Sequence, residues 1–436
     1  MELITGQDIK ISLLDKPPRN FPNSVLSEIF SILAAARDKH ARQAQAVPVP
    51  RDAVACIKAL SALACVWQGF KQLAQPLLCQ TIVISRDAQH HLFFRTLRHN
   101  RSLGRLVKDM TFFELRDYCT RENAAFPSLI DNSWDILAPD PVADDMKRLW
   151  GQVPRPDRNE LGENVPEIRD AVLELLTVLK HLPNLKFLRY VGRASQTMFG
   201  SVLTKVIDTI PSWLALGMFR DLEEMEIIGC TADIWFKRIF ESFSFPRLRS
   251  LAVTYLGSPP AETAIITLPV SFSPLATIRE LRLSLPHLPP AYLLSLLVSI
   301  DLEVLHLDLF SLAENGSHED VWFAVSSRYQ TLRDLRFLAV LEMPDVLLFS
   351  TGVGPLYLWY SMFPPNIQVL AITAWFIKSD VAARLEELLT KFWRVPMLRR
   401  IVVREKIGQA PLIKATLRDV VERCNMRNIA YSHEWV

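Results

Sequence analysis

Three hexapeptides, LRSLAV at 248–253, IRELRL at 278–283 and LEVLHL at 302–307, share one spacing: apolar residues stand at the first, fourth and sixth positions. Alternating apolar and polar residues are typical of a strand with one buried face. The spacing recurs about every thirty residues, which leaves room for one strand and one helix per unit. The eight instances begin at residues 185, 222, 248, 278, 302, 332, 367 and 398, and a weaker ninth begins at 107.

This spacing resembles the strand portion of a leucine-rich repeat, in which a short strand and its covering segment stack on their neighbours. The resemblance implies an α/β fold, an irregular solenoid with a parallel sheet on its concave face and helices on its convex face. Ser379 can cap a helix that carries an apolar stripe, and prolines near the start of several strands end the preceding helices. Helical patterns lie between the strands at 167–181, 231–243, 319–329 and 379–393.

Regular leucine-rich repeats carry Asn or Cys three residues after the last apolar strand position, where the side chain bonds to turn amides. Only Cys230 holds that position in this chain. We therefore expect an uneven arc without an asparagine ladder. An all-helical solenoid is disfavoured, because the strand segments are rich in β-branched and aromatic residues.

A second informative stretch precedes the repeats: FPNSVLSEIFSIL at 21–33 and LSALACVWQGFKQLAQPLL at 60–78. Pro22 suits the first turn of a helix, and apolar residues follow at helical spacing in both segments. The two segments resemble the helices of an F-box, with Cys65-Val66-Trp67 at the place of the family's Val-Cys-x-x-Trp-like segment. Phe21 stands where the family has Leu, and residues 34–55 form an insertion between the two halves.

The F-box resemblance implies that the N-terminal helices bind the Skp-type adaptor of a cullin-RING ubiquitin ligase, while the repeats hold a protein substrate for ubiquitin transfer. The chain itself then performs no bond chemistry and needs no cofactor. Two alternatives remain: the helices could merely cap a scaffold that has no ligase link, or the chain could be a hydrolase or transferase on an α/β fold. The residues assigned to adaptor docking by motif match are Phe21, Pro22, Val25, Leu26, Ile29, Phe30, Val66 and Trp67.

Composition is consistent with an intracellular protein that has a large core. Half of the 436 residues are apolar and 22 % are charged. The 49 basic and 47 acidic side chains give a net charge of +2, which offers no electrostatic case for binding nucleic acid. Six scattered cysteines without a C-x-x-C pair are expected to be buried thiols. No secretory signal is recognisable, and prolines interrupt the most apolar stretch, 281–300, so we expect a cytoplasmic or nuclear protein without a membrane span.

These patterns divide the chain into three parts: a polar extension at 1–20, an F-box-like helical domain at 21–80 and a solenoid at 81–436. The solenoid contains the strand-like segment 81–84 near its start. Residues 138–166 are rich in Pro, Asp and Arg, which are poor material for the interior of an element, and we expect them to form an insertion between repeats.

Catalytic motifs are missing from the sequence. It has no zinc-protease, P-loop, nucleophile-elbow or dinucleotide-binding signature, so we expect a binding protein rather than an enzyme. His90 and His91 with Asp87 and Cys79 could be drawn as a metal cluster. Their spacing matches no familiar zinc site, and no metal is predicted.

The polar residues between the inward positions of each strand are expected on the concave face. Four of them, Glu226, Arg282, His306 and Arg336, are predicted to form one row across neighbouring repeats and to bind the substrate. Along the chain these outward charges run from acidic to mixed to basic, up to Arg400 and Arg404, which would suit a partner with an oppositely graded surface. The alternative is an ordinary solvated sheet face.

Overall fold

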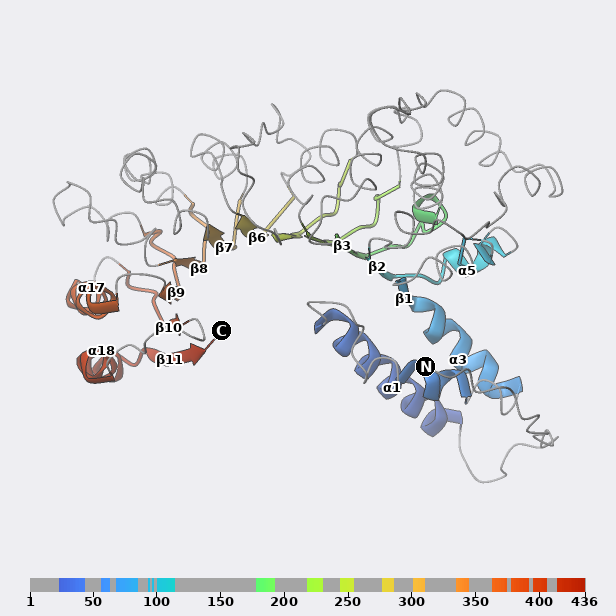
Figure 1. Ribbon diagram of the computed structural model, residues 1–436, viewed down its shortest axis with the longest axis horizontal. Helices are drawn as coiled ribbons and strands as arrows, with labels where there is room; N and C mark the ends of the chain where they lie inside the picture. The colour runs from blue at the N-terminus through green and yellow to red at the C-terminus, as the bar shows by residue number, and fades with distance from the viewer. Residues whose placement is uncertain are drawn as a thin grey trace, which may run out of the picture. The chain divides into compact units, whose positions relative to one another are not determined.

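Short parallel strands and α-helices make up the described part of the chain (Figure 1). Contacts within the chain define two units. The described residues up to Phe113 and residues 178–185 belong to the first unit, and the remainder to the second. Within the stretches that the structure describes, no helix combines the length and apolarity needed to cross a membrane. The computed structural model describes residues 23–43, 56–62, 68–84, 93–94, 96–97, 100–113, 178–192, 218–229, 244–254, 277–285, 301–309, 335–344, 363–374, 378–391, 395–405 and 414–435.

The first unit joins the N-terminal helices to two strands. Helix α1 continues to Gln43, well into the segment 34–55 that we expected to be an insertion. The three alanines at 34–36 favour a helix, and Ala34 and Arg37 are buried. Strands β1 and β2 pair in parallel with Thr81 opposite Asp109, which confirms the strand-like segment at 81 and the weak repeat at 107. The elements are α1 (Asn23–Gln43), helical residues 56–62, α3 (Gln68–Gln80), β1 (Thr81–Ile84), α5 (Arg101–Gly104) and β2 (Asp109–Phe113).

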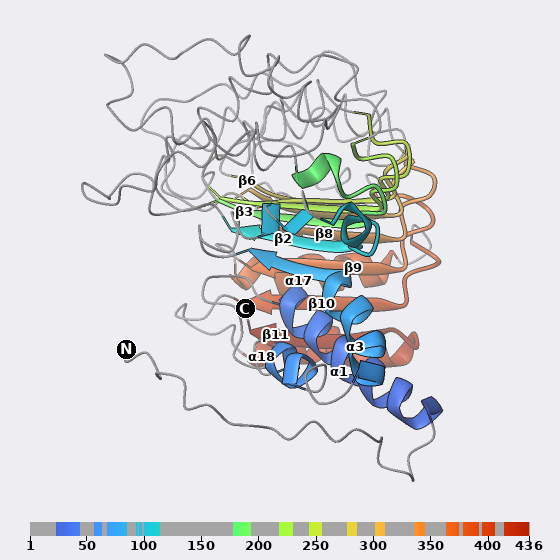
Figure 2. The ribbon, with the colours of Figure 1, turned by 90° about the vertical axis from the view of Figure 1, so that its right-hand side faces the viewer.

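The second unit contains a parallel sheet in which each strand pairs with the next strand in the chain. Figure 2 shows these strands side by side, with the short turns that lead into them along one edge. One strand per repeat confirms the predicted α/β class and is consistent with a solenoid. The strands are β3 (Phe187–Val191), β4 (Glu224–Ile228), β5 (Ser250–Thr254), β6 (Glu280–Leu285), β7 (Val304–Leu309), β8 (Val340–Pro344), β9 (Val369–Ala374), β10 (Arg400–Glu405) and β11 (Ala430–Trp435).

Alternate strand residues form the core of this unit. In β5 the residues alternate between half-buried and buried, as the pattern of a strand with one inward face requires. Burying one such leucine side chain stabilises the fold by about 1.5–3 kcal/mol. Strand pairing brings the inward residues of successive repeats into one row: Met225, Leu251, Leu281, Leu305, Leu341, Leu370 and Ile401, each no more than 2 % exposed.

A backbone ladder connects the repeats where the strands begin. The carbonyl of Glu223, just before β4, accepts hydrogen bonds from the amides of Arg249 (2.8 Å) and Ser250 (3.1 Å) in the next repeat. The same arrangement repeats from the Lys186 carbonyl to the Ala430 amide. Neighbouring turns are thus joined through backbone groups, at the opposite end of the strands from the place where an asparagine ladder would lie.

Whereas β11 follows the end of α18 with Asn428 at a positive φ of 57°, the turns before β3, β4, β5, β8, β9 and β10 share one form, illustrated by the one before β5. Its first and fourth residues, Phe245 and Leu248, are buried, and the Leu248 amide donates to the Phe245 carbonyl (3.3 Å). Phe245 also stacks on Phe219, the first residue of the preceding turn, with ring centroids 5.2 Å apart. We call the row of turns before β3 to β11 the leading edge of the sheet.

One repeat adopts a different register from the predicted one. The expected strand Leu332-Leu335-Phe337 is wrong: β8 begins at Val340, and Phe337 is 59 % exposed. Leu338 is buried as the fourth residue of a turn whose first residue is Leu335, and Leu341 takes the inward strand position. The cause is a run of leucines at 332, 335, 338 and 341, which fits several registers equally well.

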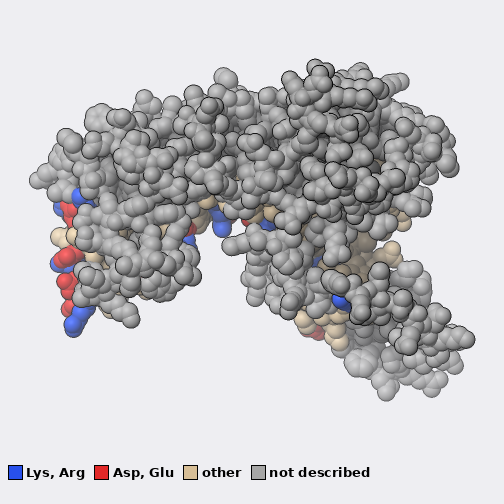
Figure 3. All heavy atoms as spheres, in the orientation of Figure 1, with Lys and Arg blue, Asp and Glu red and all other residues tan. Residues whose placement is uncertain are grey.

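Two helices lie beside the last strands, α17 (Lys378–Thr390) and α18 (Lys414–Met426). Helix α17 confirms the pattern predicted at 379–393, although it begins before Ser379. Helix α18 and strand β11 were not predicted. Charges of both signs lie over these helices (Figure 3), and Arg423 Nη2 of α18 donates to Glu386 Oε1 of α17 (2.5 Å). Residues 231–243, 319–329 and most of 167–181, like the expected insertion at 138–166, lie outside the described residues.

Candidate functional site

The first candidate surface is on helix α1. Phe30 is 1 % exposed and forms a small core with Ala34, Leu60 and Ala74, so it holds α1 against the other helices. Ile29 is 40 % exposed and lies on the surface. Val25 and Leu26 lie within α1, but only their backbone is described, and Phe21, Pro22, Val66 and Trp67 lie outside the described residues.

Two features of α1 were not foreseen from the sequence. Ile32 is 61 % exposed, and its i,i+3 spacing places it on the same face as Ile29. Arg37, which we had placed in the insertion, is buried and donates from Nη1 to the Leu77 carbonyl of α3 (2.8 Å). The hydrogen bond fixes α1 against α3 and leaves the two isoleucines on the exposed side of the pair.

The second candidate surface is the face of the second unit's sheet that points away from its leucine rows. Strand pairing brings Glu226, Arg282 and His306 into one row, as predicted, with Ala252 between the first two. Arg336 is not in this row, because the register of its repeat was wrong, and it lies in the turn before β8. Glu342 takes its place opposite His306.

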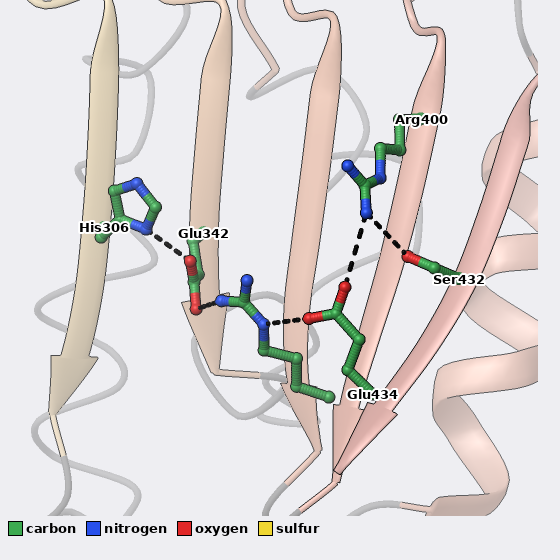
Figure 4. Close-up of polar contacts among 6 residues, drawn as sticks. His306, Glu342, Arg400, Ser432 and Glu434 are labelled. Carbon is green, nitrogen blue, oxygen red and sulfur yellow. Dashed lines mark hydrogen bonds and ion pairs between the residues drawn. The ribbon is translucent and has the colours of Figure 1, made fainter. Parts of the chain in front are cut away.

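The polar side chains at one end of this row form a network that spans β7 to β11 (Figure 4). His306 Nδ1 contacts Glu342 Oε2, and the other carboxylate oxygen of Glu342 accepts from Arg404 Nη1. Arg404 Nε also donates to Glu434 Oε2 (3.0 Å). Glu434 Oε1 in turn accepts from Arg400 Nη2 (3.4 Å). Carboxylates and guanidinium groups therefore alternate across the strands.

Small residues make this network possible. Glu342 and Arg404 belong to β8 and β10, which are separated by β9, and the residue of β9 opposite Glu342 is Ala371. Arg404 itself is opposite Thr373, so its long side chain passes β9 beside two small residues, Thr373 and Ala371. We expect a bulky residue at position 371 to disturb the contact.

The network fixes the charge of its central carboxylate. Burial alone would raise the pKa of Glu342, but hydrogen bonds from His306 and Arg404 lower it to about 2. Glu342 is therefore ionised at neutral pH and accepts a hydrogen bond from His306 Nδ1–H, which leaves Nε2 as the second polar atom of the imidazole. Burial opposes ionisation of Arg404 too, but its carboxylate partners raise its pKa.

At the other end of the row, Arg189 of β3 donates from Nε to Glu226 Oε2 (2.6 Å). The Arg189 side chain is only 5 % exposed, and all five residues of β3 are buried. Strand β3 therefore offers no exposed side chain to a partner, although Glu226 is still 23 % exposed. Between the two clusters, β5 to β7 present an open window whose described outward residues are half-buried or exposed: Ser250, Ala252, Thr254, Glu280, Arg282, Ser284, Val304 and His306.

Arg282 is the prominent cation of the window. Its side chain is 57 % exposed and pairs with Glu280, two residues earlier on the same strand (Nε to Oε1, 2.6 Å). The residue opposite Arg282 on β5 is the small Ala252, and its neighbours Ser250 and Thr254 on the same face are short as well. This geometry can hold an extended polar segment across the strands, with Arg282 and His306 as its contacts.

The predicted gradient of charge is not present on this face. Glu226 is neutralised by Arg189, and Arg400 and Arg404 are both paired with Glu434. Arg336 lies in a turn. Glu226, Arg400 and Arg404 are each matched by a charge of opposite sign on a neighbouring strand, and Arg282 by Glu280 of its own strand. The pairs across strands cannot be read from the order of charges along the chain.

Comparison with known proteins gives no further information on these two surfaces. No protein family matches the chain, and a search of curated proteins returned no match.

Proposed function

We propose that the chain is the substrate-recognition subunit of a Skp-cullin-F-box ubiquitin ligase. In this proposal α1 binds a Skp-type adaptor, and the window on β5 to β7 binds a protein substrate. The observation that carries the proposal is the exposure of Ile29 and Ile32 on one face of α1. Neighbouring exposed apolar side chains on a helix that is already packed on its other face favour a missing protein partner.

The role of the sheet face rests on the open window around Arg282. The charged groups on both sides of the window are bonded to one another. We therefore expect the substrate to contact Arg282, His306 and the short side chains of β5. Glu342 replaces Arg336 in this proposal, and its function is to orient His306 through Nδ1.

A binding assay with a purified Skp-type adaptor tests the first half of the proposal. Replacing Ile29 and Ile32 together by Asp should weaken the complex by about a hundredfold, because two apolar contacts are lost and two charges are buried. The matched control is the pair Ser31→Asp and Ala35→Asp, which adds the same charge to exposed positions of the same helix. Circular dichroism and thermal unfolding should be unchanged in both double variants.

One observation favours the alternative of a capped scaffold. Helix α3 leads directly into β1, and the Lys108 amide beside β2 donates to the Gln80 carbonyl at the end of α3 (2.8 Å). Helices so closely joined to the first strands suit a solenoid cap. If the wild-type chain does not bind the adaptor, or if the control pair weakens binding as much as the isoleucine pair, the capped scaffold is the better description.

A further inference from the structure

Exposed apolar residues also gather on the leading edge of the second unit. Among the described residues five large apolar side chains are exposed; two are Ile29 and Ile32, and the other three are Phe337 (59 %), Met397 (49 %) and Met426 (71 %). Phe337 and Met397 hold the same third position in the turns before β8 and β10, and Met426 ends α18 shortly before β11.

The four turns before β8 to β11 are neighbours in space. Asn366 Nδ2, in the turn before β9, donates to the Arg336 carbonyl in the turn before β8 (2.5 Å). The amides of Arg399 and Ala430 continue the backbone ladder to β10 and β11. We call residues 335–339, 363–368, 395–399 and 425–429 the C-terminal leading edge.

This edge is positively charged as well as apolar. Arg336, Arg399 and Arg427 are exposed on it, and these four described segments contain no Asp or Glu. Exposed apolar and guanidinium groups stand together at the starts of β8, β10 and β11, and the turn before β9 between them carries the uncharged Asn366 and Gln368. Glu422, one helical turn before Met426 in α18, is exposed beside this edge, so the excess of arginine holds for the four segments and not for all of their surroundings. Exposed apolar patches are typical of protein interaction sites, and Phe, Met and Arg are enriched in such sites.

The spacing of the turns fits a helix. Neighbouring strands lie about 4.8 Å apart, and one turn of an α-helix rises about 5.4 Å. A helix lying across the edge thus brings successive turns close to successive repeats, so that residues i, i+3, i+4 and i+7 can meet the apolar side chains. Methionine side chains are flexible and can adjust to the small difference in spacing.

We propose that the C-terminal leading edge binds an acidic amphipathic helix of a partner protein. The apolar face of this helix packs on Phe337, Met397 and Met426, and its carboxylates pair with Arg336 and Arg399. The site uses none of the residues of α1 or of the window around Arg282, so it does not depend on the ligase proposal.

Fluorescence anisotropy with the full chain and labelled synthetic peptides tests this site. The probe is a helical peptide with Leu at positions i, i+3, i+4 and i+7 and Glu elsewhere. One reference peptide has Lys in place of Glu, and the other has the acidic sequence scrambled. We expect the acidic amphipathic peptide to bind and both references to bind at least about tenfold more weakly, a difference of about 1.4 kcal/mol.

Paired substitutions locate the site. Arg336→Gln with Arg399→Gln, or Phe337→Ser with Met397→Ser, should each weaken binding of the acidic peptide by about tenfold or more. The matched control is Arg220→Gln with Arg249→Gln, which changes exposed residues at the same positions of the turns before β4 and β5 and should leave the affinity within about twofold. All four changed residues of the test pairs are exposed, so thermal unfolding should not move.

Two results would overturn the proposal. One is equal affinity of the wild-type chain and both test pairs for the acidic peptide. The other is sedimentation of the chain with phosphatidylserine vesicles, lost in the Phe337 and Met397 pair, without binding of the acidic peptide; the edge would then be a membrane contact.

Discussion

The two halves of the leading edge have the same backbone but different side-chain chemistry. Before β3 to β7, ion pairs connect neighbouring turns and strand starts: Lys186 with Glu223 (2.8 Å), Arg247 with Asp221 (2.8 Å) and Arg279 with Asp301 (3.4 Å). Before β8 to β11, Phe337, Asn366 and Met397 occupy the third turn positions that Asp221 and Arg247 hold in the first half. The carbonyl ladder continues through both halves.

This difference shows that the fold does not depend on the side chains of the edge. The ladder uses backbone groups alone, and the buried first and fourth turn residues recur in both halves. Exposed ion pairs contribute about 0–1 kcal/mol each, so their loss from the second half costs little. Stability therefore does not explain why apolar groups stand there, whereas the proposed partner would.

The largest change in the free energy of unfolding is expected from substitutions that test whether the repeats of the two halves share one core. Leu251→Ala in β5 and Leu370→Ala in β9 should each lower the free energy of unfolding by about 2–5 kcal/mol, because both side chains are fully packed in the same row. Chemical denaturation measures the loss. Hydrogen exchange should increase most in the altered repeat and its neighbours.

The control for this prediction is Phe337→Ala, which should change the free energy of unfolding by less than about 0.5 kcal/mol, since the ring is on the surface. A loss comparable to that of Leu370→Ala would mean that Phe337 is in the core, as the sequence alone had indicated, and would remove the apolar edge. A much smaller loss for one of the two leucines would mean that the halves are packed differently.

The sequence predicted the repeats well, because a buried strand position tolerates few residue types. Seven of the eight strong strand patterns, and the weak one at 107, match the structure, and the eighth failed where evenly spaced leucines allow several registers. Strand β11 escaped notice because its inward positions carry Tyr431 and His433 in place of the usual aliphatic residues.

The candidate surfaces were predicted less well, because they depend on which side chains meet across strands. Strand pairing unites Glu342 with His306 and lets Arg404 pass β9 to reach Glu342, contacts that no spacing along the chain encodes. The turn pattern, an apolar residue three positions before most repeats and often followed by Pro, was visible in the sequence and would have revealed much of the leading edge.

An intermediate effect is expected when a carboxylate on the sheet face beside the second half, Glu342, is compared with a carboxylate of the first half, Glu223. Glu342→Gln should lower the free energy of unfolding at neutral pH by about 1–3 kcal/mol, because the side chain is mostly buried and bound to His306 and Arg404. The pKa of Glu342 is about 2, below the ordinary 4.5. Its contribution is therefore complete above pH 4.5 and is lost as the pH falls toward 2.

Glu223→Gln is the matched change in the first half. Hydrogen bonding to Lys186 lowers the pKa of Glu223 as well, but its side chain is 40 % exposed and water screens the pair. Denaturation between pH 2 and pH 7 should therefore show a smaller loss for this variant. Equal losses for the two variants would show that the His306–Glu342–Arg404 contacts are no stronger than a surface ion pair.

The smallest change in the free energy of unfolding is expected from a double variant that gives the first half of the leading edge the side-chain types of the second half. Asp221→Asn with Arg247→Met replaces an ion pair of the first half by the uncharged and apolar types found at Asn366 and Met397. The free energy of unfolding should fall by less than about 1 kcal/mol, because third turn side chains do not enter the core and exposed pairs are weak. The wild-type chain should lose the same small amount when salt is raised, since salt screens exposed charges, whereas the double variant should respond less. A loss of several kcal/mol would show that edge side chains are needed to align the turns, and the apolar residues of the second half would then require a structural explanation instead of a partner.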